Sequence, residues 1–243
     1  MKKNYLLLMG ICCIFSCQDY SEELINPEEV ITSVIIQPRQ IDADGESQAI
    51  IAVTFPTGLA REKAIADIRT SSGIFRESGK DLVTINGNLE KGPDNTMHQI
   101  GRATLVSPNV EGEAVITTRI AGYARTDKLQ FHQAFADLMV IETDVLELKK
   151  GPDYKATITV TLLRTRGRGK PSTNSNVSLT LKDQEGNNHG IIQPTSNQTG
   201  ADGKCKFVLS RGADNYIGPL ILEATNPQSA QPLTKSIQIH FVD

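Results

Sequence analysis

The chain has no tryptophan, and aromatic residues make up only 5% of its 243 residues. Sites for sugars and for unpaired nucleic-acid bases usually stack the ligand on exposed aromatic rings, so this composition counts against both. The formal net charge of -3 also provides no general attraction for a phosphate backbone. We therefore expect no nucleic-acid partner.

Cysteine and histidine are also scarce. Cys12, Cys13 and Cys17 lie near the start of the chain, and Cys205 stands alone in the remainder. A single cysteine excludes an internal disulfide from the body of the fold, even in an oxidising compartment. The histidines show neither His-x-x-x-His nor His-x-His spacing, so they do not indicate a zinc site (His98, His132, His189 and His240). We expect neither a metal nor a cofactor in the fold.

No combination of residues indicates catalysis. The run Gly45–Ala49 resembles a nucleophile elbow, a motif that needs a strand before it and a helix after it. Here the run follows a turn and opens a predicted strand. We expect no enzymatic activity and assign no catalytic or cofactor-binding residue.

The chain also lacks a long hydrophobic run. The longest, Tyr5–Phe15, is too short for a transmembrane helix, which needs about 20 apolar residues. Lys2 and Lys3 precede it, and Ser16-Cys17 and an acidic stretch follow it. This order is typical of a secretory signal peptide, and no Ala-x-Ala-like cleavage site is present. An ordinary secreted protein is the alternative to the lipoprotein interpretation below.

The same segment resembles the signal of a bacterial lipoprotein, in which a small residue precedes a cysteine that becomes the first mature residue. The resemblance implies a signal peptide at 1–16, acylation of Cys17 and a tether at 17–29. It also implies attachment through Cys17 to the outer membrane of a Gram-negative bacterium. The acidic stretch is similar to a signal for display on the cell surface. Cleavage before Cys17 would leave 23 basic and 28 acidic residues, a net charge of -5.

The body of the chain has the alternation of short β-strands. Apolar and polar residues alternate with a period of two, which places one set of side chains in a core and the other in water (Ser47–Phe55, Lys155–Leu162, Val177–Leu181 and Ser236–Phe241). Turn signals such as Asp44-Gly45 and Asp202-Gly203 separate the strands. Many short strands with such turns predict β-sandwiches. The stretch Leu59–Ile65 is helix-like but too short to be more than a turn.

An internal repeat divides this body. Three segments recur at an offset of about 100 residues, the size of one immunoglobulin-like sandwich. The matched pairs are Val53–Phe55 with Val160–Leu162, Gly101–Leu105 with Gly203–Phe207, and Leu129–His132 with Ile237–His240. We therefore predict two domains, at 30–135 and 136–243.

These segments resemble the bacterial Ig-like domains of the invasin and intimin family. The resemblance is carried by an Ala-Asp-Gly turn, a Thr/Val-rich strand, a Ser-Gly bend, a Gly-x-Ala strand and a last alternating strand (Ala43–Gly45, Ile50–Phe55, Ser72-Gly73, Gly101–Leu105, Glu113–Thr117, Gly200–Leu209 and Leu220–Thr225). It implies an all-β fold of two tandem immunoglobulin-like β-sandwiches. Cys205 replaces the usual alanine and is expected to be a small buried residue. The segment 76–99 is longer than the pattern, which leaves the strand order there open.

Acidic residues suggest one candidate metal site. Asp42, Asp44 and Glu46 alternate around Gly45, but the later ligands of a calcium loop are missing. A junction between the domains would let further carboxylates contribute (Asp137, Asp144, Asp153 and Asp202). The ordinary interpretation is a polar turn.

The candidate ligand-binding loop is basic: Arg164, Arg166, Arg168 and Lys170, spaced by glycines before Pro171. We expect it at the free end of the second domain, where its charge would suit a sulfated glycan, a phosphate or a lipopolysaccharide. A solvated loop is the other interpretation.

Together these features predict a non-catalytic, lipid-anchored Ig-like rod for adhesion or for binding a surface protein or glycan. One alternative is a glycan-binding accessory lipoprotein of an outer-membrane uptake system. Another is a fimbrial-type subunit that assembles by strand donation.

Overall fold

The computed structural model describes residues 31, 33–56, 59–91, 95–228 and 231–243. Cys17, the signal peptide and the tether lie outside the described residues. Within them nearly all regular structure is β-strand, and the helical element is a single 3-10 turn, η1 (Arg61–Lys63). None of the helical structure described is long and apolar enough to cross a bilayer. The predicted all-β fold is confirmed, and Leu59–Ile65 contains only this turn.

The first sandwich contains two sheets. One has the strand order β1-β3-β8-β5, with β7 also paired to β8, and the other has the order β2-β10-β9-β4-β6. The strands are β1 (Ser33–Gln37), β2 (Gln40–Ala43), β3 (Gln48–Thr54), β4 (Ile65–Thr70), β5 (Ile74–Phe75), β6 (Leu82–Asn86), β7 (Asn88–Lys91), β8 (Met97–Val106), β9 (Gly112–Ile120) and β10 (Tyr123–Gln133).

The second sandwich repeats this plan with two four-stranded sheets, β11-β13-β16-β15 and β12-β18-β17-β14. Its strands are β11 (Leu138–Thr143), β12 (Glu147–Lys149), β13 (Lys155–Leu163), β14 (Ser178–Lys182), β15 (Ile191–Ser196), β16 (Lys204–Ser210), β17 (Gly218–Asn226) and β18 (Leu233–Val242).

The alternation in the sequence explains the packing. In β3, Ala49, Ile51 and Val53 are fully buried, while the intervening Ile50 is about half exposed. The buried apolar residues form two separate cores, of which one ends at Phe131 and the other begins at Ala136. We call the two halves domain 1 (31–135) and domain 2 (136–243).

The first segment of each domain forms two short strands, one in each sheet. In domain 1, β1 pairs antiparallel with β3, and β2 then pairs parallel with the last strand, β10. In domain 2, β11 and β12 do the same with β13 and β18. In each sandwich the first segment therefore joins both sheets, and its second strand runs parallel to the last strand of the same domain.

The pairing also corrects the register of the repeat. Phe131 lies opposite Gly112 at the start of β9, and Phe241 lies opposite Gly218 at the start of β17. These two phenylalanines are therefore equivalent, whereas the sequence alignment had matched Phe131 with Ile239. The predicted equivalence of His132 and His240 is wrong by two residues.

The long segment 76–99 adds an edge to each sheet of domain 1. β6 extends its sheet beyond β4, and the chain then crosses to the other sheet, where β7 pairs with β8. The crossing occurs at Gly87, where a Cβ atom would lie 2.8 Å from the ring of Phe55. Only glycine lets the backbone pass this close to the core.

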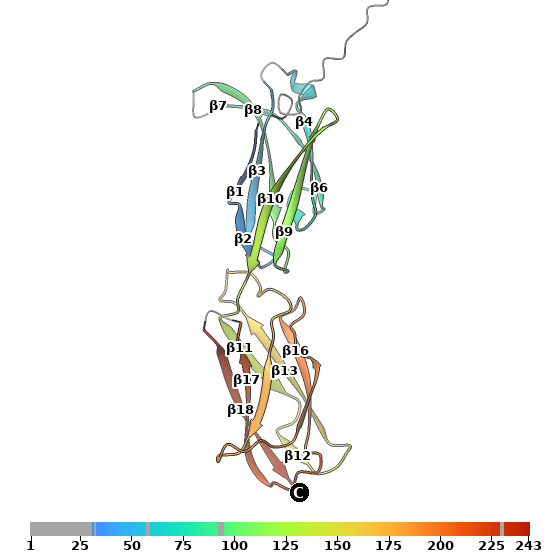
Figure 1. Ribbon diagram of the computed structural model, residues 1–243, viewed down its shortest axis with the longest axis vertical. Coiled ribbons are helices and arrows are strands. Elements are labelled where there is room, and N and C mark those ends of the chain that lie inside the picture. The colour runs from blue at the N-terminus through green and yellow to red at the C-terminus, as the bar shows by residue number, and fades with distance from the viewer. Residues whose placement is uncertain (1–30, 32, 57–58, 92–94, 229–230) are drawn as a thin grey trace, which may run out of the picture.

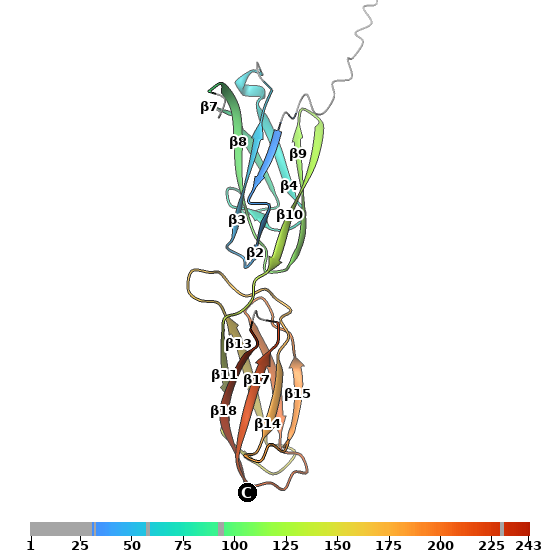
Figure 2. The ribbon, with the colours of Figure 1, turned by 60° about the vertical axis from the view of Figure 1, so that its left-hand side comes forward.

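The two domains stand end to end (Figure 1). The chain runs through β1 toward the junction and reaches it at the end of β2. It therefore enters domain 1 at the end remote from domain 2. The C-terminus lies at the opposite end of the molecule, and a second view shows the same linear arrangement (Figure 2).

Candidate functional site

The basic loop between β13 and β14, residues 164–177, lies at the junction of the domains (Figure 2). The backbone N–H of Lys170 donates to the carbonyl of Asp44 at 3.0 Å, and that of Thr173 donates to the carbonyl of Asn109 at 2.8 Å. The prediction that this loop lies at the free end is therefore wrong. The reason is topological: β11 leads away from domain 1 and antiparallel β13 leads back, so the loop after β13 returns to domain 1.

Arg164 is part of this junction. Its Nη2 lies 2.7 Å from Asp42 Oδ2 and its Nη1 lies 3.1 Å from Asp44 Oδ2, so one guanidinium from domain 2 bridges two carboxylates of domain 1. The Arg164 side chain is only 3% exposed. The planar guanidinium suits such a paired arrangement. Its terminal nitrogens are therefore occupied within the protein.

The carboxylate of Asp44 is held in place by hydrogen bonds from its own turn and from Ser107. Its carboxylate accepts hydrogen bonds from the backbone N–H groups of Glu46 and Ser47 at 2.9 and 2.6 Å, and from the hydroxyls of Ser47 and Ser107 at 2.8 and 3.1 Å. Burial alone would raise the pKa of Asp44, but these hydrogen bonds outweigh it and lower the pKa. The carboxylate is therefore held ionised, facing Arg164.

The candidate calcium ligands are not gathered into one site. Asp42 and Asp44 lie together, but they are engaged by Arg164, and Asp137 instead bonds to Thr165 and Arg168. Across the described part of the chain, no group of three or more histidine, cysteine or acidic side chains is placed to hold a metal ion.

Ser172 completes the attachment of the loop. Its buried hydroxyl donates to the carbonyl of Ala43 at 2.8 Å and accepts from the N–H of Ala134 at 2.8 Å. Gly169 packs directly on Asp44, since a Cβ atom there would lie 2.7 Å from the carboxyl carbon. The junction thus combines an ion pair, backbone hydrogen bonds and close packing.

The other predicted ligand-binding residues are exposed. Arg168 Nη1 lies 3.4 Å from Asp137 Oδ2, and the Arg168 side chain is 60% exposed. Arg166 and Lys170 are exposed as well. The structure therefore separates Arg164, which joins the domains, from three cations on the surface beside the junction. Their role in binding an anionic ligand stays a prediction.

A second polar cluster, which sequence reasoning missed, lies at the free end of domain 2. His189, in the loop after β14, places Nε2 2.9 Å from Asp183 Oδ2 and Nδ1 2.9 Å from Asp214 Oδ2. Its ring also packs on Tyr216, with the centroids 4.3 Å apart. The members come from two loops far apart in the sequence, so no short motif signals the cluster.

The charges of this cluster are mutually stabilising. The hydrogen bond with Asp183, followed by those with Asp214, raises the pKa of His189 despite its burial. The hydrogen bonds from Asn187 and His189 lower the pKa of Asp183 to about 2. Because ionised carboxylates only accept, this geometry suits the imidazolium form of His189, in which both ring nitrogens donate. The cluster joins the loop after β14 to the loop after β16.

Arg211 is buried at the same end of domain 2. Its Nε donates to the carbonyl of Asp214 at 2.9 Å and its Nη1 to the carbonyl of Val242 at 2.7 Å, while the guanidinium lies 5.4 Å from the ring centre of Phe241. The buried cation therefore ties the loop after β16 to the last strand.

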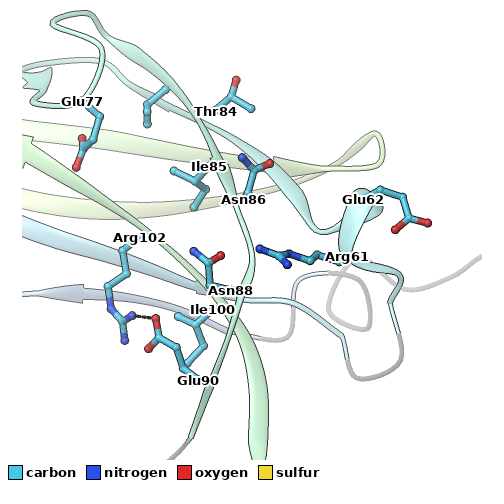
Figure 3. A pocket seen from close by; sticks show the side chains of 11 residues that line it. Arg61, Glu62, Glu77, Thr84, Ile85, Asn86, Asn88, Glu90, Ile100 and Arg102 are labelled. Carbon is cyan, nitrogen blue, oxygen red and sulfur yellow. Dashed lines mark hydrogen bonds and ion pairs between the residues drawn. The ribbon is translucent and has the colours of Figure 1, made fainter.

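Domain 1 carries a polar depression of about 750 Å³ between its two sheets (Figure 3). Arg102 and Glu90 form an ion pair at one side of it, and Glu77 accepts a hydrogen bond from the backbone N–H of Thr104 at 2.8 Å. Asn86 and Asn88 project between these groups and Arg61. Thr84 also lines the depression, and its hydroxyl donates to Asp67 Oδ1 at 2.6 Å.

Comparisons with known proteins identify the fold. No protein-family model and no curated protein sequence matches the chain. The adhesin InvE of Yersinia pseudotuberculosis is structurally similar, with 15% identity, a TM-score of 0.52 and coverage of 87% of this chain and 58% of that one. Invasin, described as a bacterial integrin-binding protein, matches with 16% identity, a TM-score of 0.61 and coverage of 86% of this chain and 38% of its own.

The chain thus spans less than two thirds of either structure, 58% of InvE and 38% of invasin. At these identities the likeness concerns the fold alone. The predicted tandem immunoglobulin-like fold of invasin type is confirmed.

Proposed function

We propose that this chain is a non-catalytic, lipid-anchored surface protein whose two domains form a stiff rod that presents its free end to a partner in adhesion. The observation that carries the proposal is the junction, where Arg164 bridges Asp42 and Asp44. Relative motion of two domains is the default expectation where little holds them together. This junction instead holds a buried ion pair, which favours a fixed alignment.

The similarity to adhesins supports the same function. InvE is an adhesin and invasin binds integrin, and both share the tandem Ig-like fold of this chain. Fold alone does not specify a ligand. We therefore propose for this chain only the general role, which is contact with a partner at a bacterial surface. We do not propose that it binds integrin.

The direction of the chain suits an anchor at Cys17. The polypeptide enters domain 1 at the end remote from domain 2, so an N-terminal lipid would leave domain 2 farthest from the membrane. Two or more acyl chains give stable attachment, whereas one chain is marginal. In this orientation the loops fastened by His189 and Arg211 form the outer surface, where Ig-like modules commonly bind.

The structure does not favour assembly by strand donation, which needs a sandwich with a vacant strand position. Here β1 and β10 occupy the first and last positions of domain 1, and β11, β12 and β18 occupy them in domain 2.

The anchor is tested with Cys17→Ala, with Cys13→Ala as the matched control in the leader. Cys17→Ala is expected to abolish labelling by radioactive palmitate, while Cys13→Ala keeps it. Retained label in Cys17→Ala would contradict lipidation at this residue.

Adhesion is tested separately, with bacteria that express the wild-type chain or a chain truncated before Ala136. Wild-type cells are expected to bind host or partner cells, and the truncated form, although anchored, is expected not to bind. Equal binding by the two strains would exclude domain 2 as the adhesive part.

A further inference from the structure

We propose that β6, at the edge of domain 1, binds an extended peptide segment of a partner protein, which pairs with β6 as an added strand. The proposal goes beyond anchoring and adhesion, since it assigns a second binding surface to domain 1, away from the free end of domain 2. It also differs from strand donation, because the added strand would extend a complete sheet and would not fill a vacant position inside a sandwich.

The backbone of β6 has one bonded side and one free side. β6 is the last strand of its sheet, and the N–H of Thr70 at the end of β4 donates to the carbonyl of Asp81 at 2.9 Å. Because the backbone groups of an antiparallel pair point alternately toward and away from the partner strand, those of Leu82 and Thr84 point away from β4. Within the part of the chain that the structure describes, nothing bonds the backbone N–H or carbonyl of Leu82 or Thr84.

The polar depression of about 750 Å³ lies beside this free side (Figure 3). Four consecutive residues of β6, Val83–Asn86, line it, although the side chains of a strand point alternately to opposite faces. Thr84 is one of the four, yet its hydroxyl bonds to Asp67 on the outer face of the sheet. The depression therefore reaches the backbone edge of β6 and provides room there for another chain.

β6 also lacks the features that usually protect an edge strand, which are charged residues, proline, a bulge or a covering loop. Domain 2 has such features. β15 contains Pro194 with an irregular register after it, and beside β14 the N–H of His189 donates to the carbonyl of Leu181 at 3.0 Å. By contrast, the sequence of β6 is Leu-Val-Thr-Ile-Asn, without charge or proline. Its valine, threonine and isoleucine favour pairing with another strand.

The free edge and the depression together indicate the chemistry of the ligand. A row of backbone N–H and carbonyl groups is matched by another extended backbone, and alternate side chains of that backbone would enter the depression. Acidic, basic and amide side chains line it (Arg61, Glu62, Glu77, Asn88, Glu90 and Arg102). We expect uncharged polar side chains on the face of the peptide that enters the depression, since hydroxyl and amide groups hydrogen-bond to donors and acceptors alike.

A second copy of the chain fits this edge less well than a different protein. In a symmetric pair of β6 strands the two strands would run antiparallel. The strands of domain 1 run along the rod, so the two rods would then point in opposite directions (Figure 1). Chains anchored at Cys17 in one membrane point the same way, and this step rests on the proposed anchor.

The test selects ligands for the full mature chain, purified in detergent, from a library of short random linear peptides displayed on phage. Residue-resolved amide hydrogen exchange is then measured with and without each synthesised peptide. At least one peptide is expected to slow exchange at Leu82 and Thr84, while Val83 and Ile85, which face β4, exchange slowly in both states. If no peptide binds, or if the bound peptides leave Leu82 and Thr84 unprotected, the proposal is wrong.

Thr84→Pro is the decisive variant, and Thr84→Val is its matched control. Proline removes the N–H that points away from β4, whereas valine keeps that N–H and loses only the hydroxyl bonded to Asp67. Thr84→Pro is expected to weaken peptide binding at least tenfold relative to Thr84→Val, with a similar melting temperature. Equal affinity of the two variants would overturn the proposal. The exchange measurement on the wild-type chain decides the question if Thr84→Pro does not fold.

Sedimentation equilibrium of the wild-type chain without peptide tests the alternative occupant. A monomer is expected. A dimer that is abolished by Thr84→Pro and kept by Thr84→Val would show that β6 pairs with a second copy, and it would overturn the assignment to a partner protein. None of these measurements depends on adhesion or lipidation in cells, so their failure is distinct from failure of the proposed function.

Discussion

The guanidinium of Arg164 in domain 2 lies 3.1 Å from the carboxylate of Asp44 in domain 1, and both side chains are at least 95% buried. The sequence suggested separate roles for these residues, a ligand-binding loop and a turn. The structure instead unites them as the centre of the junction. Two such charges are stable in a poorly solvated place only when they face each other and are hydrogen-bonded.

Removing one partner should therefore loosen the junction. Arg164→Met keeps much of the side-chain length but leaves Asp44 buried without its cation, and we expect the free energy of unfolding to fall by about 2–3 kcal/mol. Urea denaturation measures this loss, and small-angle scattering should show a broader distribution of interdomain distances. The control is Arg166→Met, an exposed cation in the same loop, which should change stability by less than about 0.5 kcal/mol. Equal effects of the two substitutions would show that the ion pair does not hold the domains together.

Two glycines in the same loop provide a second matched pair. Gly167 and Gly169 have φ values of 84° and 72°, which alanine disfavours by about 1 kcal/mol at each site. A Cβ atom at Gly167 has nothing within 4 Å, whereas one at Gly169 would lie 2.7 Å from the carboxyl carbon of Asp44. Gly169→Ala should therefore destabilise the protein by at least about 1 kcal/mol more than Gly167→Ala. Identical denaturation midpoints would contradict the close packing of the loop on Asp44.

The cluster around His189 should make stability depend on pH. Because the pKa of His189 is raised above 6.5, its cation stabilises the folded state fully below that pH, and this contribution is lost as pH rises through the folded pKa. The pKa of Asp183 is lowered from 3.8 to about 2, so its contribution is present above 3.8 and is lost as pH falls through about 2. Their combined contribution is therefore largest between about pH 4 and 6.5.

His189→Gln tests the alkaline side of this window, because glutamine keeps hydrogen-bonding capacity without a charge that titrates. Thermal unfolding from pH 5 to 9 should show a decline for the wild-type chain that is smaller in the variant. Parallel profiles would mean that His189 does not carry a stabilising charge.

Cys205 is buried in β16, and burial raises the pKa of its thiol to about 11. At pH 8 very little thiolate forms, so iodoacetamide should modify Cys205 slowly in the folded protein and rapidly in urea. Mass spectrometry over time measures both rates. Fast labelling of the native chain would contradict the burial of this residue.

The exposed part of the basic loop is tested without disturbing Arg164. Arg166→Ser with Lys170→Ser should keep the melting temperature, since both side chains are exposed. If the loop binds anionic polymers, the variant should elute from heparin at lower salt than wild type. Unchanged elution would support the interpretation as a solvated loop.

The sequence predicted β-strands in both domains, but not which residues of their last strands are equivalent. A strand with a period of two is nearly identical to itself after a shift of two residues, so matching Phe131 with Ile239 satisfied the alternation as well as matching it with Phe241. The positions of Gly112 and Gly218 opposite the two phenylalanines decide between these alignments. Those contacts exist only between paired strands.

The sequence by itself determined the all-β architecture, because alternation and turn residues act locally and indicate a buried face before any partner is known. It also indicated that Cys205 is buried. Only the tertiary structure decided which charges are free and which are paired. Arg164 and Arg166 are two residues apart and look alike in the sequence, yet one is held by Asp42 and Asp44 and the other is exposed. The partners of Arg164 come from strands and turns 120 or more residues away, and chain topology alone brings them together.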